Sequence, residues 1–126
     1  MALLVFFTLK STVASQQMQL LQEELPRYIM SRQAMLDCYD RYLAEALPGN
    51  RSRILVLKSR YLNGAAVQVL RRARSVEDVL TARDLQLQAA DCEENPAERQ
   101  AIIRRVHEAY ATPEALLPKQ GKFVPR

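Results

Sequence analysis

Apolar positions recur at intervals of three and four residues through most of the chain, which is the spacing of one face of an α-helix. The pattern predicts helices over about 26–47, 51–74, 76–92 and 96–110. Leu, Ala, Arg, Gln and Glu, which all favour helices, dominate the sequence. We therefore predict an all-α protein: a three-helix bundle followed by a fourth, C-terminal helix. In the second helix the apolar stripe consists of Ile54, Leu57, Tyr61, Leu62, Ala65, Val69 and Leu70.

Turn and cap residues divide the helical pattern at three places. The Pro-Gly-Asn tripeptide at 48–50 breaks it, and its Asn is a suitable N-cap for the next helix. Ser75 followed by Asp78 has the form of a capping box with Asp in place of Glu. Asn95 and Pro96 combine a cap residue with a proline at the first helical position. These signals fix where the last three predicted helices begin.

Both ends of the chain are predicted to be arms. Residues 1–25 form an apolar arm with a short amphipathic helix, 26–92 the bundle, and 93–126 the C-terminal helix with an extended basic tail. The first apolar run is far shorter than the roughly 20 residues that span a bilayer. Its basic residue, Lys10, follows that run, whereas a secretory signal carries basic residues before it. Since an exposed apolar arm would promote aggregation, we expect it to pack on a neighbouring subunit or on the chain's own core.

Composition places the chain among folded helical proteins without obvious chemistry. Its 126 residues suit one domain, and 48% apolar with 25% charged residues excludes global disorder. Cys38 and Cys92 match no metal spacing and no disulfide framework. We interpret both as small buried apolar residues, with a bridge between them left open.

No catalytic constellation is present in the sequence. The single histidine, His107, has no evident partner, and the acidic pairs Asp37/Asp40 and Glu93/Glu94 are typical of a solvated helix surface. No phosphate-binding loop, nucleophile elbow or metal motif occurs. We predict no enzyme activity, no cofactor of its own and no metal. A helical enzyme that holds an anionic substrate with arginines is the weaker alternative.

Positive charge is concentrated in the second predicted helix. Between residues 51 and 74 there are seven basic residues and no acid, and the rest of the chain is net negative. Such a run opposes compaction unless something anionic binds to it, although a solvated basic face is the simpler explanation. Gly64 in the same helix costs about 1 kcal/mol relative to Ala, and either admits another backbone or is merely tolerated. The predicted partner-binding residues are Arg51, Arg53, Lys58, Arg60, Arg71 and Arg72.

Three kinds of anionic partner suit this basic helix to different degrees. Nucleic acid suits the charge, but the aromatic and amide residues that stack on or read bases are scarce around 51–74. A membrane surface suits an amphipathic basic helix, but its apolar stripe is needed for the bundle core. An acidic protein requires only complementary charge across a helical face. The sequence therefore favours an acidic protein partner.

A family resemblance supports this interpretation. The stretch 35–46, MLDCYDRYLAEA, resembles the first-helix signature of the mitochondrial LYR-motif proteins. Cys38-Tyr39-Asp40 stands where that family has Leu-Tyr-Arg, so only the tyrosine is kept. The basic helix and the Ser75–Val79 turn follow in the order of the family's second helix and acidic turn, and the resemblance covers about residues 34 to 92.

The resemblance implies a specific function. LYR proteins are three-helix scaffolds that bind acidic acyl carrier protein and serve as accessory subunits or assembly factors of respiratory complexes. It therefore implies a non-catalytic accessory subunit, of complex I in particular, on the matrix side of the mitochondrial inner membrane. Such a subunit would be peripheral and could contact the carrier's acyl-phosphopantetheine. The alternative is a small bacterial or phage helical adaptor that binds another protein or nucleic acid. The residues that would line the bundle interior are Tyr39, Leu43, Leu57, Tyr61 and Leu80.

Overall fold

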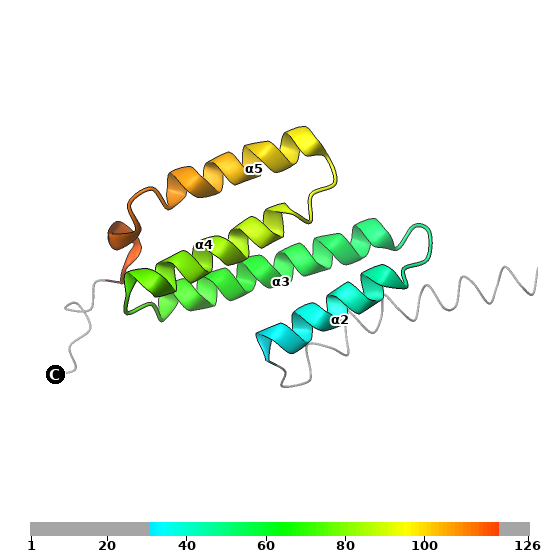
Figure 1. Ribbon diagram of the computed structural model, residues 1–126, viewed down its shortest axis with the longest axis horizontal. Helices are drawn as coiled ribbons and strands as arrows, with labels where there is room; N and C mark the ends of the chain where they lie inside the picture. Colours follow the sequence, from blue (N-terminus) through cyan, green and yellow to red (C-terminus); the bar gives the residue numbers. More distant parts are fainter. Residues whose placement is uncertain (1–30, 119–126) are drawn as a thin grey trace, which may run out of the picture. The chain divides into compact units, whose positions relative to one another are not determined.

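The computed structural model describes residues 31–118, and all regular structure in this part of the chain is helical (Figure 1). The all-α prediction is confirmed. The predicted N-terminal arm and the end of the basic tail lie outside the described residues. The helices are α2 (Arg32–Ala44), α3 (Arg51–Arg71), α4 (Val76–Ala90), α5 (Pro96–Ala109) and the 3-10 helix η3 (Pro113–Leu116).

α4 and α5 begin where the cap residues predict, whereas α2 begins at Arg32, after the cap residue Ser31, and not at the predicted position 26. Ser75 Oγ accepts the Asp78 N–H at 3.3 Å, and Asp78 Oδ2 in turn accepts the Arg74 N–H at 2.9 Å. At the start of α5, Asn95 Oδ1 accepts two N–H groups, at 3.0 and 3.1 Å, from the residues that follow Pro96. Each cap satisfies N–H groups that have no partner within the helix. Short polar side chains therefore set the starts of α4 and α5.

The turn before α3 also matches its prediction. Gly49 has a φ of +94°, a left-handed conformation that other residues rarely adopt. Asn50 is buried, and its carbonyl accepts the Ile54 N–H at 2.9 Å, the first hydrogen bond of α3. This is the backbone role of an N-cap residue.

The ends of the helices differ from the prediction by a few residues. α2 stops at Ala44, three residues before its predicted end, and α4 stops at Ala90. α3 stops at Arg71 because the next two N–H groups bond to carbonyls only three residues back, each at 3.2 Å. Such tightened last turns are common, and sequence patterns locate them poorly.

The chain divides into two compact units, Met1–Lys58 and Ser59–Arg126. The division falls within α3, whereas the sequence grouped 26–92 as one bundle. In the first unit, α2 and the start of α3 form a helical hairpin (Figure 1). Its buried apolar side chains include Met35, Tyr39 and Ile54.

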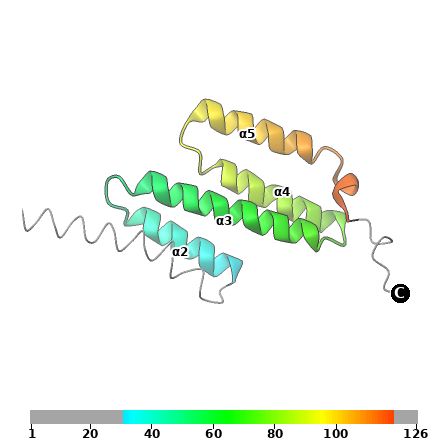
Figure 2. The same ribbon diagram turned by 180° about the vertical axis from the view of Figure 1, so that it is seen from behind.

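In the second unit, α4 lies between α5 and the part of α3 that follows Ser59, as both views show (Figures 1 and 2). α4 also contacts η3. Full burial of a Leu or Val side chain contributes about 1.5–3 kcal/mol, so a few such residues hold these helices together. The buried apolar residues here are Leu62, Ala66, Ala73, Val79, Ala82, Leu85, Ala89, Ala90, Cys92, Val106 and Tyr110. Within the described residues, no helix is long and apolar enough to cross a membrane.

Candidate functional site

The predicted basic residues of the first unit differ in their surroundings. Arg51 and Arg53 are exposed in the first turn of α3. Lys58 is half-buried, and its Nζ lies 2.7 Å from Oδ1 of Asp40 on α2. Its charge is therefore already matched by a carboxylate within the protein, which distinguishes it from the arginines.

In the second unit the predicted residues are exposed. Arg60, Arg71 and Arg72 form no ion pair or side-chain hydrogen bond with any residue in the described range 31–118. α3 itself contains no acidic residue. Their charges are therefore available to an external anion.

Four residues of the second unit define an outer face of α3: Arg60, Gly64, Val67 and Arg71. At about 100° per residue they fall within an arc of about 60° on the helix. All four are exposed, and Val67, at 40%, is one of two large apolar residues described as exposed. A Cβ added at Gly64 would meet nothing within 4 Å. The outer face thus combines two unpaired arginines with an apolar side chain and an open position on the backbone.

The residues predicted to line the bundle interior are less deeply buried than expected. Tyr39 is buried, and the other four, Leu43, Leu57, Tyr61 and Leu80, are half-buried. Tyr39, Leu43 and Leu57 belong to the first unit, and the other two to the second. None of the five lines the groove described next.

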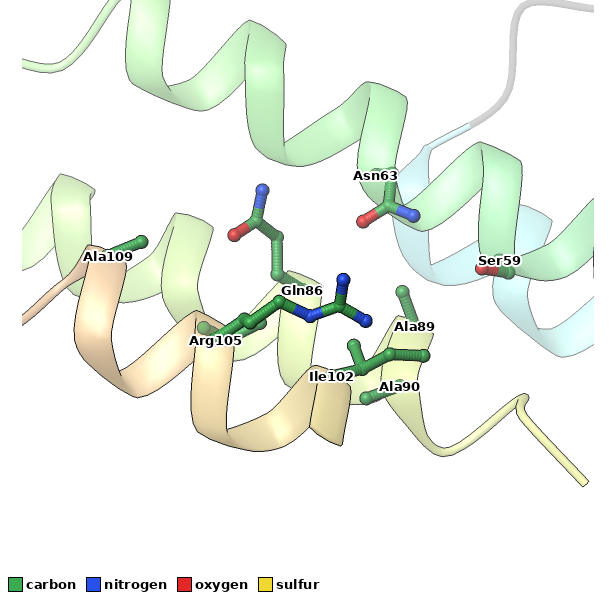
Figure 3. A pocket seen from close by; sticks show the side chains of 9 residues that line it. Ser59, Asn63, Gln86, Ala89, Ala90, Ile102, Arg105 and Ala109 are labelled. Carbon is green, nitrogen blue, oxygen red and sulfur yellow. The ribbon is translucent and has the colours of Figure 1, made fainter. Parts of the chain in front are cut away.

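The second unit contains a partly open groove of about 270 Å³, bordered by α3, α4 and α5 (Figure 3). Its apolar lining is made mostly of short side chains, and Ala89, Ala90 and Val106 are buried. Because an alanine side chain ends at Cβ, these positions leave space between the helices. The complete lining is Ser59, Asn63, Gln86, Ala89, Ala90, Ile102, Arg105, Val106 and Ala109.

Three polar side chains from three helices point into this groove. Figure 3 shows Asn63 of α3, Gln86 of α4 and Arg105 of α5 directed toward the same space. None of the three has a side-chain hydrogen bond or ion pair within residues 31–118. Arg105 is the one charged residue in the lining. The groove therefore offers several hydrogen-bond donors and a positive charge beside an apolar wall.

The sequence did not reveal this groove. Its polar residues come from three helices and share no motif. The sole local signal is the small pair Ala89-Ala90, which is equally typical of close helix packing.

The remaining candidate residues form no reactive cluster. Cys38 is half-buried and Cys92 buried, and the two are not joined by a disulfide bond. The Cys92 thiol donates to the Gln88 carbonyl, with Sγ and O 3.7 Å apart. His107 is exposed on α5. No three His, Cys, Asp or Glu residues between 31 and 118 are grouped so that they could hold a metal ion.

Comparison with known proteins gives no relative: no protein-family model, curated protein or solved structure matches the chain. The outer face of α3 and the groove are therefore the two surfaces that indicate a function.

Proposed function

We propose that this chain is a non-catalytic scaffold subunit that binds an acidic protein partner through the outer face of α3. The observation that carries the proposal is the pair Arg60 and Arg71, exposed on one side of a helix without acids and unpaired within the described chain. Complementary charge speeds the encounter of two proteins and fixes their orientation.

The uncharged residues of the outer face favour a protein over a nucleic acid. Val67 offers an apolar contact between the arginines, and Gly64 lets a partner's backbone approach closely. A phosphate backbone needs neither feature, and no aromatic residue lies on this face to stack on a base. The pattern instead suits an acidic helix that also carries apolar side chains.

The resemblance to LYR-motif proteins supports a more specific form of the proposal. The partner would be an acyl carrier protein, and the chain an accessory subunit of a mitochondrial respiratory complex such as complex I, on the matrix side. Asp40, which stands at the place of the motif's arginine, is paired with Lys58. Because Lys58 is already paired, the carrier's acids would bind instead to the unpaired arginines Arg60, Arg71 and Arg72. The carrier's acyl-phosphopantetheine would be a further contact with the chain.

Charge reversal at the end of α3 tests the proposal. In calorimetric titrations with purified acylated acyl carrier protein, we expect the variant Arg71→Glu to bind at least about tenfold more weakly, or about 1.4 kcal/mol. Arg71 is exposed, so the helical circular dichroism should persist. Arg104→Glu is the matched control, because Arg104 is also exposed but lies on α5.

Unchanged affinity of the Arg71→Glu variant would overturn the binding-face assignment. Equal loss in the control would show that the effect is one of net charge alone. If the wild-type chain ignores the carrier but binds duplex DNA with a steep salt dependence, the helical adaptor is the correct alternative.

A further inference from the structure

We propose that the groove between α3, α4 and α5 binds a short aliphatic carboxylate. The proposal does not depend on the outer face of α3. Ser59 and Asn63, which line the groove, lie about 110° and about 70°, respectively, around the helix from the centre of that face. A ligand in the groove and a partner on the outer face therefore contact different residues.

The charge of the groove selects an anion. Among residues 31–118, Arg105 is the one charged residue of the lining, and no carboxylate lines the wall. A guanidinium donates two parallel hydrogen bonds to a carboxylate, a geometry that an ammonium does not provide. The amide N–H groups of Asn63 and Gln86 point into the same space and can donate to the remaining lone pairs (Figure 3).

The apolar wall and the size of the groove define the rest of the ligand. Beside the polar groups lie Ile102, Val106 and the short side chains of three alanines. An aliphatic tail placed there is removed from water, which stabilises the complex in proportion to the apolar surface that it buries. The volume of about 270 Å³ lies just below the range of about 300–1,000 Å³ that holds drug-sized ligands. A tail of a few carbons fits this space.

The same features disfavour inorganic phosphate. A doubly charged anion is best held by several cations or by a row of backbone N–H groups, whereas the groove has a single arginine and an apolar wall. A monocarboxylate needs one guanidinium for its head group and uses the wall for its tail. The groove is thus matched to an amphiphilic anion.

Titration of the full chain with hexanoate tests the proposal. We expect saturable shifts of the Asn63 and Gln86 side-chain amide signals in NMR spectra, with a dissociation constant of about 1 mM or tighter for so small a ligand. Arg105→Ala should weaken binding about tenfold or more, because the charged partner of the carboxylate is lost. Arg104→Ala is the matched control, since Arg104 is exposed on the same helix but does not line the groove. The control should bind as the wild-type chain does.

Hexanol and inorganic phosphate serve as competing probes. We expect neither to saturate these signals at concentrations where hexanoate does, because one lacks the charge and the other the tail. Hexanol binding as tightly as hexanoate would show that the groove recognises only the apolar tail. Phosphate binding as tightly as hexanoate would show that the groove recognises only the charge. The proposal would be overturned by either of these results, by equal weakening in the Arg104→Ala control, or by the absence of a saturable shift with hexanoate. Unchanged acyl carrier protein binding in the separate charge-reversal experiment would overturn the assignment of the outer face and not that of the groove.

Discussion

Lys58 shows how a single residue can belong to two patterns. Lys58 lies four residues after Ile54 and four residues before Leu62. It is therefore on the same side of α3 as these two fully buried residues. Its stem can lie along this apolar stripe while its ammonium reaches Asp40. The sequence shows that Lys58 is charged but not that a carboxylate on another helix pairs with it. For this reason the sequence alone predicts Lys58 as a partner-binding residue.

Tyr110 is a second residue whose environment only the structure reveals. Its side chain is buried, and its hydroxyl has no hydrogen-bond partner within the described residues. Burial disfavours the charged phenolate and raises the pKa of Tyr110 above 10.0. The folded protein therefore keeps this proton to a higher pH than the unfolded chain does. This contribution to stability is complete below pH 10 and is lost as the pH rises further.

Tyr110→Phe should stabilise the protein at neutral pH. An unsatisfied buried polar group costs about 1–3 kcal/mol, so we expect urea denaturation at pH 7 to show an unfolding free energy higher by about 1 kcal/mol. The variant should also lose less stability than the wild-type chain above pH 10. Tyr42→Phe, at a half-buried tyrosine of α2, is the control and should change stability less. A destabilised Tyr110→Phe variant would show that the hydroxyl has a partner outside the described residues.

At the scale of helices, local chemistry predicts where a helix starts better than it predicts which side of the helix is buried. Ser75 and Asn95 locate two helix starts because their caps involve only neighbouring residues. The buried side of α3 depends on what packs against it: Leu57 and Tyr61 were expected inside but are half-buried, whereas Ala66 is fully buried and was not singled out. The groove likewise depends on packing between helices, so the sequence alone could not indicate it.

Gly64→Ala separates the two explanations for the glycine in α3. The position is exposed and open, so alanine should raise the unfolding free energy by about 1 kcal/mol in urea denaturation. If a partner's backbone approaches here, the same methyl group should weaken acyl carrier protein binding, so stability and affinity change in opposite directions. A more stable variant that binds as tightly as the wild-type chain would show that glycine is merely tolerated.

Gly49→Ala is the matched control for this substitution. Gly49 has a φ of +94°, so alanine there should destabilise the protein through backbone strain. A stabilised Gly49→Ala variant would contradict the left-handed conformation of this turn.

For the molecule as a whole, the distribution of charge matters more than its sum. The formal net charge is +4, yet the chain outside residues 51–74 carries more acids than bases. A partner's acids are therefore attracted most strongly to the basic segment 51–74, which favours one orientation of approach.

This distribution predicts a salt-dependent association rate. Between about 0.15 M and about 1 M salt the Debye length falls from about 8 Å to about 3 Å, and long-range attraction is screened. In surface-plasmon measurements with immobilised acyl carrier protein, we expect the association rate to fall about tenfold or more and the dissociation rate to change less. An association rate that is insensitive to salt would contradict electrostatic recruitment by α3.

The position of Asn63 directly before Gly64 has a consequence for the ageing of the protein. Asparagine is among the thermolabile residues. Both residues lie within α3, so the reaction requires this part of the helix to open. The Gly64 nitrogen then attacks the Asn63 side-chain carbonyl, ammonia leaves, and water opens the resulting ring to a carboxylate. The resulting deamidation would replace a neutral amide with a carboxylate at the mouth of the groove, where Arg105 also points. Stored protein would then carry an internal anion in place of a donor, so the mass of the peptide containing Asn63 is a direct measure of how much of a preparation retains an intact groove.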